Sequence, residues 1–399
     1  MIKKELLRAC CPASRILVIT VLYWFSLFAV SLLLASEQVA TDPTAYAPVM
    51  DGSYASAVVM DADTGEILMA KNPHARRQPA SMLKMMTELI VLERIAEGDM
   101  SLEEKVEVSA HASRMGGSQV YLKHGEVFSV GELLMALSIH SANDASVALA
   151  EHVAGSKEAF IDLMNLRARE LGMHDTEFHS VHGLPAAWKQ QPDLTSVYDM
   201  ALLGRELIRF PQALDWASTA TAPFRDGEFI MYNPNKLVGT YRGLDGIKTG
   251  YHGQAGFCVT ATAVQKDKRL ISVVMGCPSD KARATETTRL LSYGFNLYTR
   301  VTLVEKEGQV LGSKLAVKGG KTRDVEVAYA EPLTVSVLKN RVGELILEAK
   351  LPEKAPAPLE AGQIVGTGVA RLGQHVLGEV PIVTIAAVPK GNWLDRLFK

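Results

Sequence analysis

The chain has 399 residues, and its 42 Lys and Arg against 44 Asp and Glu give a formal net charge of −2. The two signs of charge are interspersed, which excludes both the basic surface of a nucleic-acid-binding protein and an acidic solvating tail. A single hydrophobic core stops growing well before this length, so we expect two globular domains with short tails.

The N-terminus has the features of an export signal. Basic residues precede an apolar run over residues 16–35, and polar residues follow it. The run is also long enough to cross a bilayer, so cleavage after Ala35 and retention as an anchor both stay open. Either outcome places the rest of the chain outside the cytoplasm. We therefore expect a signal peptide or signal anchor over 1–35 and a linker over 36–52.

From residue 53 the pattern predicts strands, then helices, then strands again. A capping box of Ser129 and Glu132 starts one of the helices. Strands are predicted over 55–60, 66–70, 246–251, 256–264 and 269–275, and the other helices over 81–97, 144–153, 157–171 and 282–298. We expect an α+β fold, in which one antiparallel sheet built from distant segments is flanked by helices and carries an all-helical subdomain.

Residues 301–389 predict a separate, smaller all-β domain. Alternating apolar segments lie over 315–317, 325–328, 333–338 and 345–349, with Gly, Pro or charged turns between them. The Pro-rich segment 354–358 is interpreted as a connection inside this domain.

The last ten residues, 390–399, combine Trp393 and other apolar side chains with cations. Such a segment can form a short amphipathic helix in a membrane interface. It can equally be a chain end that covers the β domain, and both alternatives stay open.

Cysteine and histidine positions predict neither a disulfide framework nor a metal site. Only Cys258 and Cys277 lie beyond the targeting segment, so burial must stabilise the fold, and a bridge between them or two buried thiols both stay open. His179 and His182 lie three residues apart, with no cysteine or carboxylate at ligand spacing. We therefore predict no zinc and no other cofactor.

Three short motifs stand in one order along the chain: Ser81-Met-Leu-Lys84, Ser141-Ala-Asn143 and Lys248-Thr-Gly250. Each alone has an ordinary structural explanation, as a helix cap, a turn and a charge on an edge strand. Together, on a helix start, an interhelical turn and a strand, they supply the groups of an acyl-transfer site.

Ser81 is the predicted nucleophile. One helical turn brings Lys84 to the same face, where it could take the proton of the Ser81 hydroxyl. The amine must be neutral for this, and burial together with the charge of Lys248 would lower its pKa. Ser141 can relay a proton to the leaving amine, and Asn143 can hold an amide of the substrate.

The strand motif predicts what else the substrate carries. Lys248 and Thr249 suit a carboxylate, and Gly250 would let a peptide lie against the strand edge. The implied substrate therefore has an amide bond close to a free carboxylate.

With these motifs the chain resembles the D-alanyl-D-alanine carboxypeptidases among the low-molecular-mass penicillin-binding proteins, peptidase family S11. The resemblance covers roughly 53–389 and includes Ser141-Ala-Asn-Asp-Ala145, His182-Gly-Leu184 and Asp245-Gly-Ile-Lys-Thr-Gly250. It implies a penicillin-binding domain of the serine β-lactamase and DD-peptidase type over 53–300. It also implies a β-rich second domain and a C-terminal amphipathic anchor on the outer, periplasmic face of the cytoplasmic membrane.

The resemblance further implies a reaction. The terminal D-alanine of peptidoglycan stem pentapeptides would be removed through an acyl-serine intermediate, as part of cell-wall biogenesis, and penicillins would acylate the same serine. By position, the acyl-enzyme serine would be Ser81, its proton acceptor Lys84 and the further catalytic hydroxyl Ser141. Substrate would contact Asn143, Lys248 and Thr249, and the oxyanion would sit between the N–H groups of Ser81 and Tyr251.

Other functions stay open on the same residues. A class A β-lactamase needs a glutamate-bearing E-x-x-L-N loop between the second and third motifs, and the sequence lacks a convincing one. A D-Ala-D-Ala endopeptidase usually resembles only the first domain. A non-catalytic penicillin-binding envelope protein would not need Ser81, Lys84, Ser141 and Lys248 intact.

Overall fold

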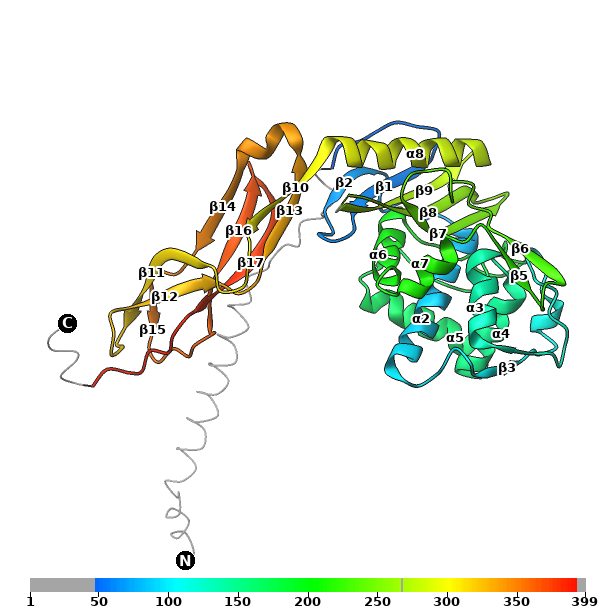
Figure 1. Cartoon of the computed structure of the whole chain (residues 1–399), viewed down its shortest axis with the longest axis horizontal. Helices are drawn as coiled ribbons and strands as arrows, with labels where there is room; N and C mark the ends of the chain where they lie inside the picture. The colour runs from blue at the N-terminus through cyan, green and yellow to red at the C-terminus, as the bar shows by residue number, and fades with distance from the viewer. Residues whose placement is uncertain (1–46, 267, 393–399) are drawn as a thin grey trace, which may run out of the picture. The chain divides into compact units, whose positions relative to one another are not determined.

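The computed structural model describes residues 47–392 apart from residue 267 (Figure 1). The predicted signal or anchor over 1–35, most of the linker and the segment 393–399 of the predicted C-terminal helix lie outside the described residues. Within the described range, no helix combines the length and the apolar character that crossing a bilayer requires.

A five-stranded antiparallel sheet in the order β2-β1-β9-β8-β7 organises the first domain. Its strands are β1 (Ser56–Asp61), β2 (Ile67–Lys71), β7 (Leu244–His252), β8 (Gly256–Gln265) and β9 (Lys268–Cys277). Strand β1 pairs with β9 from Ser56 opposite Met275 to Asp61 opposite Leu270. The predicted antiparallel sheet assembled from distant segments is thus confirmed.

Helices cover both faces of this sheet (Figure 1). α8 (Asp280–Leu297) packs on one face, where Val59 joins a core with Leu290. α6 (Val197–Leu207) and α7 (Pro211–Ala217) lie on the other face, where Val58 joins a second core. Successive side chains of a strand point to opposite faces, and both faces of β1 are buried, so its middle residues, Ala57 to Met60, are all apolar.

The helical subdomain supports the segments that carry two of the three motifs. Its helices are α2 (Lys84–Glu97), α3 (Val130–Ile139), α4 (Asn143–Ala154) and α5 (Lys157–Glu170). The predicted capping box is present, because Ser129 Oγ accepts from the Glu132 N–H and Glu132 Oε2 accepts from the Ser129 N–H at 2.7 Å. The α-helix predicted over 81–97 begins three residues later in the structure, at Lys84. Ser81 lies in the 3₁₀ turn before it, η1 (Ala80–Leu83).

Short elements that the periodicity did not predict complete this domain. They are the hairpins β3 (Lys105–Glu107) with β4 (Val127–Ser129) and β5 (Thr221–Phe224) with β6 (Phe229–Tyr232), and the turn η2 (Ala112–Arg114). Strands of three or four residues are too short to show an alternating pattern.

The C-terminal part is all β, as predicted. β10 (Tyr298–Val304) pairs with β13 (Leu333–Leu338), and a six-stranded sheet has the order β14-β16-β17-β12-β11-β15. The remaining elements are β11 (Val310–Lys318), β12 (Asp324–Tyr329), η3 (Lys339–Glu344), β14 (Leu345–Lys350), β15 (Lys354–Pro356), β16 (Ile364–Leu372) and β17 (His375–Thr384). The Pro-rich segment is more than a connection, since β15 pairs in parallel with β11 at the sheet edge, where proline is tolerated.

A buried carboxylate links β1 to the strands that follow α8. Asp61 is fully buried, and Arg300 of β10 donates to it from Nε at 3.1 Å and from its terminal nitrogen at 2.8 Å. Ser336 of β13 donates at 2.6 Å. These bonds outweigh the effect of burial and hold the pKa of Asp61 below its usual value.

The two cysteines are buried free thiols on β8 and β9. Burial raises the pKa of Cys258 to about 11 and that of Cys277 to about 12. The sequence left open a disulfide between these cysteines or two buried thiols, and the structure has two buried thiols.

Candidate active site

Ser81 and Lys84 are in direct contact at the start of α2. Lys84 is fully buried, and its Nζ donates to Ser81 Oγ at 3.0 Å and to the carbonyl of His182 at 2.7 Å. The two acceptors fix the amine against the hydroxyl. The contact predicted from the spacing of these residues is therefore present.

The surroundings of Lys84 favour its neutral form. Burial lowers the pKa of Lys84 well below its usual value, and the positive charge of Lys248 lowers it further. The carboxylates of Asp144 and Asp193 act in the opposite direction. A neutral amine beside a hydroxyl can accept its proton, which the ammonium form cannot do.

Two glycines allow the backbone around Ser81 to pack closely. A Cβ atom on Gly250 of β7 would lie 2.4 Å from the Pro79 carbonyl oxygen, and one on Gly183 would lie 2.2 Å from that of Ala80. Ala80 itself has a positive φ of 48°. Gly250 therefore has a packing role that the sequence did not predict. Because it has no side chain, the segment that carries Ser81 can pack directly against β7.

The second motif lies where α3 gives way to α4: Ser141 and Ala142 are in the predicted turn, and Asn143 is the first residue of α4. Ser141 has a φ of 62°, and its buried hydroxyl has no hydrogen-bond partner among the described residues. Asn143 Nδ2 donates to the Gly116 carbonyl at 2.6 Å, whereas its buried Oδ1 has no partner in the same range. The free Oδ1 can accept an amide N–H from a ligand.

The third motif lies on β7 and runs from a buried cation to an exposed ring. Lys248 is 2% exposed and donates to the Thr249 carbonyl at 3.3 Å. Burial lowers the pKa of Lys248 to about 7, while Glu88 raises it and Arg283 lowers it. Tyr251 is 57% exposed, and its ring stacks on Phe257 with 4.1 Å between ring centroids.

The loop that holds Lys84 is fixed by residues that the sequence analysis did not identify. Asp193 accepts hydrogen bonds from the backbone N–H groups of His179 at 2.7 Å and Ser180 at 2.8 Å, and from the Ser180 hydroxyl at 2.6 Å. Ser180 Oγ in turn accepts from the Gly183 N–H at 2.9 Å. This network places the His182 carbonyl at Lys84.

His182 contributes its backbone rather than a metal-binding ring. Its Nδ1 accepts from the Leu184 N–H at 3.1 Å. Burial and the charge of Lys84 lower the pKa of His182 to about 4, so its ring is neutral near pH 7. The described part of the chain contains no group of three or more His, Cys, Asp or Glu placed to hold a metal ion.

A second carboxylate positions the opposite side of the site. Asp144, the residue after Asn143, accepts from the N–H of Val120 at 3.1 Å and that of Leu122 at 3.0 Å. The Asn143 N–H donates to the Ser118 carbonyl at 2.7 Å. The loop before β4 is therefore attached to the second motif.

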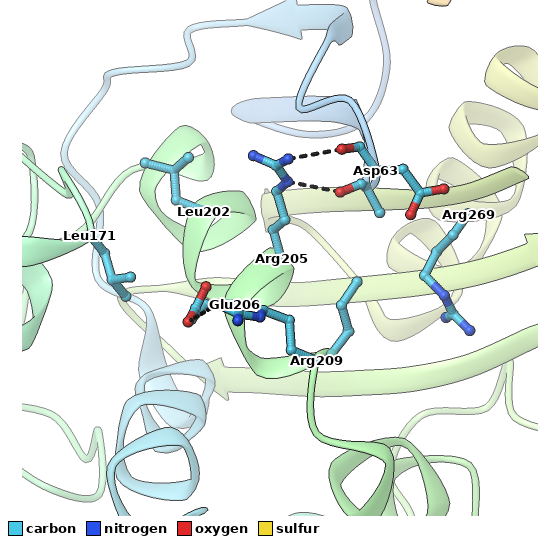
Figure 2. A pocket seen from close by; sticks show the side chains of 9 residues that line it. Asp63, Leu171, Leu202, Arg205, Glu206, Arg209 and Arg269 are labelled. Carbon is cyan, nitrogen blue, oxygen red and sulfur yellow. Dashed lines mark hydrogen bonds and ion pairs between the residues drawn. The ribbon is translucent and has the colours of Figure 1, made fainter. Parts of the chain in front are cut away.

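A cavity of about 660 Å³ away from these motifs is rich in arginine (Figure 2). Arg205 donates to the backbone carbonyls of Ala62 at 2.8 Å and Asp63 at 2.9 Å, and Arg269 donates to Asp245 at 2.7 Å. Arg209 bonds to Glu206 at 2.8 Å. Because each lining cation is already bonded within the chain, this cavity gives no evidence for an anion site.

Comparisons with known proteins agree with this geometry. A family model described as D-alanyl-D-alanine carboxypeptidase matches residues 43–279, and one described as the C-terminal domain of penicillin-binding protein 5 matches residues 298–390. The chain is 36% identical over 346 residues to D-alanyl-D-alanine carboxypeptidase DacF of Bacillus subtilis, covering 86% of this chain and 87% of that protein.

Solved structures show the same likeness. Penicillin-binding protein 5 of Haemophilus influenzae matches with a TM-score of 0.78 and 30% identity, over 86% of this chain and 99% of that one. Penicillin-binding protein D2 of Listeria monocytogenes, solved in an ampicillin-bound form, matches with a TM-score of 0.57 and 31% identity, over 62% of this chain and 100% of that one. The chain therefore belongs to the serine-type D-alanyl-D-alanine carboxypeptidases of peptidase family S11, the low-molecular-mass penicillin-binding proteins.

Proposed function

We propose that this carboxypeptidase uses Ser81 as its nucleophile and Lys84 as the base, and removes the terminal D-alanine from peptidoglycan stem pentapeptides. The observation that carries the proposal is the 3.0 Å contact between Lys84 Nζ and Ser81 Oγ, made by a lysine that is fully buried. Burial and Lys248 both favour the neutral amine that this step needs.

In the first half-reaction Lys84 takes the proton of Ser81, and Oγ bonds to the carbonyl carbon of the penultimate D-alanine. The C–N bond to the terminal D-alanine breaks, and the proton held by Lys84 passes through the Ser141 hydroxyl to the leaving amine, which restores both groups. Water then attacks the serine ester and gives a proton to Lys84, the ester C–O bond breaks to release the acyl group as a carboxylic acid, and Lys84 returns the proton to Ser81. The N–H groups of Ser81 and Tyr251 are proposed to stabilise the oxyanion.

Substrate binding is assigned to the other motif residues. Lys248 and Thr249 bind the terminal carboxylate, and Gly250 lies where the peptide runs along β7. Asn143 accepts an amide N–H of the substrate, which the unpartnered Oδ1 supports. The requirement for a carboxylate next to the scissile amide explains selectivity for a C-terminal residue.

Penicillins carry the same two features, an amide carbonyl and a nearby carboxylate, so we include them as acylating inhibitors of Ser81. The ampicillin-bound form of the Listeria protein supports this assignment. A match to the C-terminal domain model over 298–390 favours a carboxypeptidase over an endopeptidase, since the latter usually resembles only the first domain.

We also propose the location. Residues 1–35 direct export, 53–300 form the catalytic domain, 301–389 form the β domain, and 390–399 attach the protein to the outer face of the cytoplasmic membrane. Intact mass of the isolated protein decides whether cleavage occurs after Ala35. Loss of membrane association on deleting 390–399 would support the C-terminal attachment, and unchanged association would contradict it.

The test of the reaction uses the purified chain and its Ser81→Ala variant. We expect the unmodified chain to be labelled by a fluorescent penicillin and to release D-alanine from diacetyl-Lys-D-Ala-D-Ala, and the variant to do neither. Labelling without D-alanine release would favour a non-catalytic penicillin-binding protein. Rapid penicillin hydrolysis would instead favour a β-lactamase.

A further inference from the structure

Residues 116–122 form a loop beside the second motif, which we call the motif-two loop. Two of its carbonyls hold Asn143: Ser118 accepts from the Asn143 N–H at 2.7 Å, and Gly116 accepts from its Nδ2 at 2.6 Å. The packing is close, because a Cβ atom on Gly117 would lie 2.7 Å from Asn143 Nδ2. The bond to Gly116 fixes which way the side-chain amide faces, so the unpartnered Oδ1 is the end left for a ligand.

The motif-two loop has a backbone conformation that is unfavourable by itself. Tyr121 has a φ of 59°, in the left-handed region that bulky side chains rarely adopt, and it is 60% exposed. A residue in this region persists where the surrounding structure holds it there. Part of that support comes from α4, because Asp144 accepts the N–H of Val120 at 3.1 Å and that of Leu122 at 3.0 Å.

Arg225, between β5 and β6 at the tip of their hairpin, supplies the rest of the support. Its guanidinium donates to the carbonyl of Val120 at 2.6 Å and to that of Tyr121 at 2.9 Å. It also forms an ion pair with Glu126, which follows the loop. The N–H groups of the loop are thus bonded to α4 and its carbonyls to the hairpin, so the backbone around Tyr121 is fixed from two sides.

The Arg225 side chain is itself held in place. It is 16% exposed, and its guanidinium lies over the rings of Phe128 at 5.2 Å and Phe224 at 5.3 Å. The hairpin packs against α3, the helix that ends before Ser141 (Figure 1). A planar fork that bonds two successive carbonyls and lies against aromatic rings is a geometry that lysine cannot reproduce.

We propose that Arg225 is a positioning residue that acts through the motif-two loop to orient Asn143 for an amide of the substrate. This inference rests on the substrate-binding role proposed above for Asn143. The contacts run from the guanidinium to two loop carbonyls, along the loop backbone, and from two other carbonyls of the loop to Asn143. Because Arg225 acts through the loop, its loss should weaken binding of the peptide without removing a group that carries out the reaction.

The first test is the kinetics of D-alanine release by the full chain and its Arg225→Met variant. The variant leaves two loop carbonyls without their donor, so the loop can move and Asn143 loses its fixed orientation. We expect kcat/KM to fall about tenfold, mostly through a rise in KM. Arg225→Lys keeps the charge beside Glu126 but not the planar fork, so it should show the same change. An unaltered KM in Arg225→Met would overturn the proposal.

A matched control separates this effect from general damage. Arg167 of α5 is also partly buried and multiply bonded, to Glu93 at 2.6 Å and to Glu170 at 3.2 Å. None of its hydrogen bonds within the described residues goes to the motif-two loop. Arg167→Met should therefore lower thermal stability and leave KM as it is in the unmodified chain. A rise in KM that is equal in Arg167→Met and Arg225→Met would assign the effect to lost stability and overturn the proposal.

The second test asks whether Arg225 acts through Asn143. Asn143→Ala, Arg225→Met and the double variant form a double-mutant cycle in kcat/KM. Once Asn143 has lost its amide, the position of the loop matters little, so we expect Arg225→Met to lower kcat/KM less than about twofold further. Multiplication of the two single effects would show that Arg225 acts on another part of the site, and would overturn the proposal.

The third test does not require activity. The N–H groups of Val120 and Leu122 both donate to Asp144, so their hydrogen exchange reports the order of the loop. We expect exchange at these two positions to be at least about tenfold faster in Arg225→Met and unaltered in Arg167→Met. If Arg225→Met does not fold, Arg225→Lys carries the same expectation. Unaltered exchange in the Arg225 variants would overturn the proposal. Faster exchange in a chain that releases no D-alanine would instead contradict only the proposed function.

Discussion

Gly250 of β7 lies against the carbonyl of Pro79, two residues before the nucleophile. Any side chain on Gly250 would place its Cβ 2.4 Å from that oxygen and 3.2 Å from the Ala80 Cβ. The third motif therefore supports the first through packing, in addition to any contact with substrate. This relationship explains why a strand edge facing the site carries glycine where β-branched residues are otherwise favoured.

A first prediction follows for Gly250→Ala. The added methyl group must displace the Pro79 segment, so we expect penicillin acylation of Ser81 to slow at least tenfold and stability to fall by about 1–3 kcal/mol. Gly253→Ala is the control, because a Cβ there meets no atom within 4 Å. Acylation rates and urea unfolding check both variants. Equal behaviour of the two variants would contradict the packing role.

The pH dependence of the reaction follows from two lysines with opposite requirements. Lys84 must be neutral, and its lowered pKa allows this well below its ordinary range. Lys248 must be protonated, and its pKa is about 7. We therefore expect kcat/KM for D-alanine release to rise as Lys84 loses its proton and to fall as Lys248 loses its own. A rate that keeps rising above about pH 9 would contradict this assignment, since Lys248 is neutral there.

Ser141 and Ser272 offer a matched pair of buried hydroxyls, neither of which has a partner among the described residues. Removing an unsatisfied buried hydroxyl is nearly neutral or stabilising, so Ser141→Ala and Ser272→Ala should both leave thermal stability intact. Only Ser141→Ala should slow D-alanine release, by about 100-fold or more, because its hydroxyl carries a proton in the reaction. Unchanged turnover in Ser141→Ala would remove it from the catalytic set.

Those features of the site that depend on local sequence pattern could be predicted from the sequence. The capping box at Ser129 follows from residues three apart, and the contact of Ser81 with Lys84 follows from one turn of helix. The antiparallel sheet was predicted because strands at both ends of the first domain flank a helical middle. The capping box and the contact of Ser81 with Lys84 depend on spacing within short windows.

Other parts of the site depend on segments far apart in the chain. Asp193 fixes the loop around His182 by accepting from the His179 N–H, but this pairing leaves no local sequence signal.

The final prediction concerns the buried Asp61, which receives hydrogen bonds from Arg300 and Ser336. Asp61→Asn removes the charge and leaves the guanidinium short of a partner, so the free energy of unfolding should fall by about 3 kcal/mol. Asp63 also contacts Arg300 but is 61% exposed, so Asp63→Asn should cost less than about 1 kcal/mol. Because the pKa of Asp61 is lowered by folding, its contribution is present above about pH 4 and is lost as pH falls through its folded-state pKa. Urea unfolding at neutral and acid pH checks this, and an equal effect of both substitutions would contradict it.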